Sequence, residues 1–142
     1  MLKKNDLQII GCLRSNARQT LSSISKRANV PISTVYDRIR NSEKELIKKY
    51  TSLVDFAKLG YGIRIKVLTK VLNKQAFLQF IQEHSNVNSA YKLDGEYQYL
   101  IDCVFKDMKE LSEFTDQINE MSSDAKMFYV VDEIMQEEFL NH

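Results

Sequence analysis

The hydrophobic periodicity of this 142-residue chain changes once, near residue 50, and that change limits the folds open to it. Before residue 50, apolar residues recur at the spacing of helices that bury one face. After residue 60, stretches that alternate apolar and polar residues are interleaved with helical ones. We therefore expect a helical unit at residues 1–50 and an α+β unit at 63–142, joined by a connector strand at 51–62.

The helical unit begins with two short helices. The first starts at Asn5 or Asp6, either of which suits an N-cap, and ends near Asn16; its apolar stripe consists of Leu7, Ile9, Ile10, Cys12 and Leu13. Thr20 is the expected N-cap of the second, whose inner face consists of Leu21, Ile24 and Ala28. Asn29 follows it and tolerates left-handed backbone angles, so a tight turn is expected there.

A third helix follows this turn. Pro31 suits its first turn, where a missing N–H is harmless, and Val35 and Ile39 form its inner edge. The outer face presents Ser33, Tyr36, Asp37, Arg40 and, at the side, Arg38. Three short helices with a tight turn before the last predict a helix-turn-helix, whose third helix enters the major groove of DNA.

Charge is divided unequally between the two halves. Residues 1–50 hold eleven Lys and Arg against four Asp and Glu, a balance of +7, whereas the remainder has a balance of −6. A basic module on an acidic body is expected when one module binds a polyanion, so double-stranded DNA is the predicted partner. The alternative is a solvated surface that happens to be unevenly charged.

The second half predicts the order βαββαβ, which is the ferredoxin-like split motif. Its strands are expected at about 63–71, 87–93, 97–105 and 126–132. Asn73 and Asp107 open its two helices, and Asp94-Gly95 predicts a tight hairpin turn. Two helices cover only one face of such a sheet. Leu100 and Val104 make the other face apolar, which predicts a partner subunit.

Several classes of protein are disfavoured. Cys12 and Cys103 each lie in an apolar stretch without a CxxC pair or clustered His, so we expect reduced core thiols and no metal site. No catalytic or cofactor-binding motif is present, and His84 is expected to be a helix-end residue. No apolar run approaches the ~18 residues of a membrane span, and no signal peptide is evident, so we expect a cytoplasmic protein.

Five stretches of the sequence carry a family resemblance: DLQIIGCLRSNAR, LSSISKRANV, STVYDRIR, YTSLVDFAKLGYG and GEYQY. Taken together, they resemble the Lrp/AsnC family of bacterial and archaeal regulators. It implies a winged helix-turn-helix that binds palindromic DNA, and a second domain that forms homodimers and often octamers. It also implies an amino acid or related effector bound between dimers. Pro31 and Ile32 replace the family's usual polar start of the third helix, and Gln98 replaces a usual Asp.

Two sets of site residues follow. The DNA-contacting set comprises Ser33, Thr34, Tyr36, Arg38 and Arg40 on the third helix, with Lys26 and Arg27 as phosphate neighbours. Lys44, Lys48 and Lys49 are further expected phosphate neighbours. Arg38 has an alternative role, a bridge to a carboxylate inside the domain. The effector set follows from the resemblance alone and comprises Gly95, Glu96, Tyr97, Gln98, Ser122 and Ser123. For these the alternative is an ordinary hairpin and loop.

Two other functions stay open at this point. The same two-domain pattern is similar to the sirohaem decarboxylases, which would make the chain an enzyme acting on a tetrapyrrole. Gln98 in the Asp position also leaves room for an architectural DNA binder that responds to no effector.

Overall fold

The computed structural model describes residues 2–141, which divide into two units. The amino-terminal unit consists of residues 2–53 together with 134–141, and the second consists of residues 54–133. The return of residues 134–141 to the first unit differs from the expectation that the whole of 63–142 belongs to the second. It arises because these residues make their contacts with the first helix, as described below.

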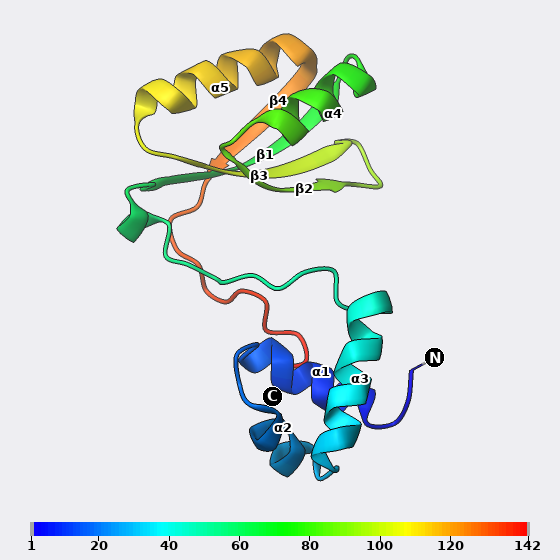
Figure 1. The fold of residues 1–142 in the computed structure, drawn as a ribbon. Coiled ribbons are helices and arrows are strands. Elements are labelled where there is room, and N and C mark those ends of the chain that lie inside the picture. Colours follow the sequence, from blue (N-terminus) through cyan, green and yellow to red (C-terminus); the bar gives the residue numbers. More distant parts are fainter. Residues whose placement is uncertain (1, 142) are drawn as a thin grey trace. The chain divides into compact units, whose positions relative to one another are not determined.

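The amino-terminal unit is a three-helix bundle of α1 (Asp6–Ser15), α2 (Leu21–Ala28) and α3 (Ile32–Glu45) (Figure 1). The Thr20 hydroxyl caps α2 by accepting from the N–H of Ser23, and Asn29 ends α2 in the left-handed conformation, as predicted. The core consists of Ile9, Cys12, Ile24, Ala28 and Val35. Leu7, which the periodicity placed in this core, is instead 53% exposed.

A buried ion pair joins α1 to α3. Arg38 donates from Nε and Nη2 to the two carboxylate oxygens of Asp6, at 2.7 and 2.6 Å. The Asp6 side chain is only 1% exposed and that of Arg38 13%. The hydrogen bond from Arg38, aided by the backbone N–H of Lys3, outweighs desolvation and lowers the pKa of Asp6 to about 2. Asp6 thus lies inside the bundle, where its fixed charge holds α3 in one rotation about its axis.

No strand occupies the segment between Glu45 and Ile63 in the described part of the chain. The connector strand expected at 51–62, and strands of a wing after α3, are therefore absent; Ala57–Leu59 instead forms a short 3-10 helix, η1. A strand needs a hydrogen-bonded neighbour, and each strand pair of this chain joins residues 63–129.

The second unit is the predicted βαββαβ fold. Its elements are β1 (Ile63–Val71), α4 (Lys74–Glu83), β2 (Val87–Lys92), β3 (Tyr99–Phe105), α5 (Met108–Met121) and β4 (Ser122–Tyr129). The sheet is antiparallel in the order β2-β3-β1-β4, and both helices cover the same face of it (Figure 1). Asn73 and Asp107 cap α4 and α5 through their side chains, as predicted.

Two details of the sheet differ from the sequence-based expectation. Asp94-Gly95 does not form a two-residue turn. Leu93 and Gln98 form the last hydrogen-bonded pair between the two arms of the hairpin, which leaves four residues in the loop. Gly95 also lacks the positive φ that a type I′ turn requires. Tyr97 therefore lies in a four-residue loop. Strand β4 begins at Ser122, four residues before the expected start, because the polar residues there pair with the end of β1.

We predict that Asp6→Asn lowers the free energy of unfolding of the amino-terminal unit by about 2 kcal/mol, because it removes one partner of a largely buried pair. The lowered pKa of Asp6 means that its stabilisation is present above the ordinary pKa of 3.8 and is lost as pH falls towards about 2. Denaturant titrations from about pH 5 to about pH 2 should therefore converge for wild type and variant. The exposed Asp37→Asn is the control; equal stability of all three proteins at neutral pH would contradict the prediction.

Candidate functional site

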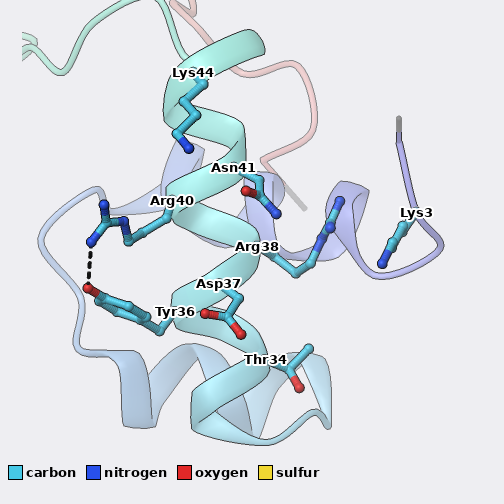
Figure 2. Close-up of a pocket in the computed structure, with 8 residues that line it drawn as sticks. All are labelled: Lys3, Thr34, Tyr36, Asp37, Arg38, Arg40, Asn41 and Lys44. Carbon is cyan, nitrogen blue, oxygen red and sulfur yellow. Dashed lines mark hydrogen bonds between the residues drawn. The ribbon is translucent and has the colours of Figure 1, made fainter.

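The outward face of α3 is polar and hollowed. An open groove of about 530 Å³ lies along it (Figure 2), lined by Lys3, Thr34, Tyr36, Asp37, Arg38, Arg40, Asn41 and Lys44. Four of the predicted DNA contacts, Thr34, Tyr36, Arg38 and Arg40, are in this set. Cationic and hydrogen-bonding side chains on one exposed helix face match what phosphate and base-edge contacts require.

Arg40 and Tyr36, one helical turn apart, form a pair on this face. Arg40 Nη1 donates to the Tyr36 hydroxyl at 2.9 Å, and the guanidinium carbon lies 5.7 Å from the centre of the tyrosine ring (Figure 2). That hydrogen bond raises the already high pKa of Arg40, so its charge is permanent. The tyrosine thereby holds an extended cation on the exposed side of α3, which lowers the entropy lost when the cation binds an anion.

Arg38 serves the fold, in the alternative role that the sequence left open. Its Nε and Nη2 are held by Asp6, and little of the side chain reaches solvent. We therefore treat Arg38 as a positioning residue that orients α3.

The remaining predicted DNA contacts lie nearby in the same unit. Ser33 is exposed in the first turn of α3, and Lys26 is exposed on α2. Arg27 donates to the Ser15 hydroxyl at 3.2 Å and to the Gln19 side-chain carbonyl at 3.3 Å, so it ties α2 to the preceding turn. Sequence reasoning missed Lys3 and Asn41. Helical spacing from Thr34 would have revealed Asn41, but nothing local placed Lys3 beside α3.

The predicted effector residues gather around the end of β1. Gln98 accepts from the Val71 N–H through its side chain at 2.8 Å and donates its own N–H to the Thr69 carbonyl at 2.9 Å. Ser122 shares a 2.5 Å hydrogen bond with the buried Thr69 hydroxyl, and Ser123 donates to the Lys70 carbonyl at 3.3 Å. The hairpin loop and the α5–β4 junction are therefore neighbours, although 24 positions separate Gln98 from Ser122.

Charged side chains surround Tyr97 in this loop. Its hydroxyl donates to Asp124 at 2.6 Å, and the amino groups of Lys70 and Lys126 each lie 5.2 Å from its ring centre. Lys70 also pairs with Glu96 at 2.8 Å, which lowers the pKa of Glu96. Gly95 is exposed at the tip of the loop. Charges of both signs thus meet at one end of the sheet, as binding of a zwitterion requires.

Sequence reasoning missed four residues of this cluster, namely Thr69, Lys70, Asp124 and Lys126. The alternation of side chains along β1 and β4 could have revealed the two lysines, because it places Lys70 and Lys126 on the sheet face opposite the helices.

The sheet face away from the helices is mixed and is less apolar than expected. Phe128, 51% exposed, lies on it because its neighbour Met127 packs into the helix-covered core. On the same face, on the far side of β1, Asp102 is 2% exposed and accepts from Arg64 through both oxygens, at 2.9 and 2.7 Å. Burial opposes ionisation of Asp102, but Arg64 and Asn88 outweigh it and lower its pKa.

His84 and the two cysteines take part in packing rather than in a reactive site. His84 lies 4.9 Å from Phe114 and 5.2 Å from Phe80 between ring centres, and burial lowers its pKa. Burial raises the pKa of Cys103 to about 12, so its thiol stays protonated. Among residues 2–141 no three His, Cys, Asp or Glu side chains gather as metal ligands would. No helix in the same range has the length and apolar character needed to cross a membrane.

Comparison with known families gives two matches. Residues 63–138 match the Lrp/AsnC ligand binding domain, and residues 2–45 match a winged helix-turn-helix DNA-binding domain. The match at 2–45 covers α1, α2 and α3 and ends with α3.

Individual relatives agree with these matches. An uncharacterized HTH-type transcriptional regulator of Pyrococcus abyssi is 27% identical over 98% of this chain and 97% of its own length. Transcriptional regulator AzlB of Bacillus subtilis is 31% identical over 80% of this chain and 76% of its own. A transcriptional regulator of Neisseria meningitidis, solved as a complex with L-Met, superposes with a TM-score of 0.84 at 26% identity, covering 96% of this chain and 94% of that one.

Proposed function

The chain belongs to the Lrp/AsnC family of transcriptional regulators, and we therefore propose that it reads specific duplex DNA through α3, under the control of an amino acid or related metabolite. It carries the family's helix-turn-helix and its ligand-binding domain. The proposal concerns how these two units act.

The observation that carries the DNA-binding proposal is the fixed outward face of α3. The Asp6–Arg38 pair sets the rotation of the helix, and the Tyr36–Arg40 pair holds a cation on its exposed side. Arg40 is the residue we assign to base or phosphate contact, with Thr34 and Lys44 along the same groove and Ser33 in the first turn of α3. Lys26 and Arg27 on α2 are assigned to phosphates, which position the unit on DNA without reading sequence.

The observation that favours an effector is the charged cluster at the end of β1. We assign the carboxylate of a bound amino acid to the Lys70 and Lys126 side of Tyr97, and its ammonium group to Glu96 or Asp124. The L-Met in the Neisseria relative supports this ligand class. Gln98 anchors the loop, so the Asp that usually stands in its place is not needed here to hold the hairpin.

We also assign homodimerisation to the sheet face away from the helices. The exposed Phe128 and the partly exposed Leu68 and Leu100 supply apolar area on this face. The charge pairs of Asp102 with Arg64 and Lys66 on the same face would fix how the two subunits align. A dimer would carry two α3 helices, which suits two half-sites about one helical turn of DNA apart.

We predict that Arg40→Gln weakens binding to the protein's own promoter DNA about tenfold and weakens binding to a scrambled duplex less. The measurement is fluorescence anisotropy across a salt series with both duplexes. Arg18→Gln, in the exposed turn between α1 and α2, makes the same charge change outside α3 and should bind like wild type. Equal losses in the two variants would mean that α3 contributes only general charge.

We predict that Phe128→Asp converts a dimer to a monomer of 16.6 kDa, because it places an unpaired carboxylate in the assigned interface. Sedimentation equilibrium measures the mass. Tyr129→Asp is the matched control, since the next residue along β4 points to the opposite face. A wild-type chain that sediments as a monomer, or a Phe128→Asp dimer, would refute this assignment.

We predict that one of the standard amino acids, with L-methionine as the first probe, raises the thermal midpoint of the chain. A ligand at about 100 times its Kd adds about 2.7 kcal/mol of stability. Gln98→Ala should reduce the shift by releasing the loop, whereas Gln75→Ala, exposed on α4, should not. If no amino acid produces a shift and promoter binding persists, the protein is an architectural DNA binder.

A further inference from the structure

The last described residues of the chain lie against α1 within the amino-terminal unit (Figure 1). We call residues 137–141 the carboxyl-terminal strap. Arg14 on α1 donates from Nε to the Phe139 carbonyl at 2.5 Å and from Nη2 to the Glu137 carbonyl at 3.0 Å. The same Nη2 lies 3.2 Å from the Glu137 carboxylate. One guanidinium therefore binds both main-chain and side-chain acceptors of the strap.

Gly11 makes this close approach possible. A Cβ at residue 11 would lie 2.9 Å from the Leu140 carbonyl oxygen, closer than real Cβ contacts come. Glycine inside a helix is less favourable than alanine, so its presence here fits a surface that must receive a backbone. In the strap, Glu137 and Leu140 adopt φ of 55° and 66°, which residues with side chains disfavour unless contacts hold them. The strap is thus in a defined docked conformation.

Strand β4 and the short segment that follows it connect the candidate effector cluster to the strap. β4 starts at Ser122 and Ser123, and just beyond its end the Val130 N–H donates to the Arg64 carbonyl at 2.9 Å. Arg64 also pairs with Glu133 at 2.7 Å. Only residues 134–136 separate Glu133 from the strap, so a displacement of β4 acts on the strap through a short length of chain.

We propose that the strap is an autoinhibitory ligand of the DNA-binding unit, and that its docking on α1 lowers affinity for DNA. The inference rests on the proposed DNA-binding function. Docking occupies the Arg14 guanidinium, which then is not available to a phosphate. Glu137 and Glu138 also reduce the charge balance of the unit from +7 to +5. Both changes weaken the attraction between this unit and a polyanion. Movement of β4 on effector binding is the natural trigger for release.

The decisive variant is Gly11→Ala in the full chain, which displaces the strap through the added Cβ without changing any charge. A glutamate-specific protease should cleave after Glu137 and Glu138 faster than in wild type. Affinity for duplex DNA at about 0.15 M salt should rise about fivefold, in the range of ordinary coupling between sites. Gln8→Ala, exposed on α1, is the matched control and should change neither quantity.

Glu137→Gln provides a second variant that does not alter helix α1. It removes the carboxylate that Arg14 binds, so cleavage after the remaining Glu138 and affinity for DNA should both rise, whereas Glu113→Gln, exposed on α5, should change neither. Unchanged cleavage in both Gly11→Ala and Glu137→Gln, or faster cleavage with unchanged DNA affinity, overturns the inhibition. If wild type and all variants fail to bind duplex DNA, the proposed function fails and the inhibition with it. Equal binding by all of them refutes the inhibition alone.

Discussion

The arrangement of the DNA-binding unit depends on the buried pair between Asp6 and Arg38. The hydrophobic core of this unit is small, and a core of that size alone is marginal and tolerates rotation of its helices. A bidentate guanidinium–carboxylate bond has a fixed plane and direction, so it removes that freedom where apolar contacts do not. The outward position of Arg40 follows from the rotation that Arg38 sets, because the two residues lie on the same helix.

A second arginine plays the corresponding part in the sheet unit. Arg64 binds the buried Asp102, pairs with Glu133 on the segment leaving the sheet, and lies over the ring of Phe56 on the segment entering it. The Arg64–Asp102 pair lies on a partly apolar face, and a protein that covers this face removes water from both charges. A partner without groups that match these charges pays that cost without compensation, so the pair discriminates between partners. The face is therefore suited to one complementary partner, such as a second copy of the chain.

Local signals in the sequence predicted the fold better than the sites. The caps at Thr20, Asn73 and Asp107 were predicted correctly because each acts on a backbone N–H three residues away. Asp6 also looked like a cap, and its burial depended on a partner 32 positions distant that spacing does not reveal. The tight hairpin failed for a related reason: Asp-Gly favours such a turn, but Gln98 bonds to Thr69 and Val71 on another strand and keeps the loop long.

The two candidate sites lie on different units, and two chain segments run from one unit to the other. Residues 46–62 form no strand, and the backbone N–H groups of Leu46, Ile47, Leu59, Gly60 and Tyr61 donate only to carbonyls three to five residues earlier in the chain. The other segment follows directly from β4, is bonded to Arg64 as it leaves the sheet, and ends in contact with Arg14. Because it is held at both ends with three residues between, it is the better mechanical connection, and the inhibition proposed above requires it to exchange between the docked state and a released one.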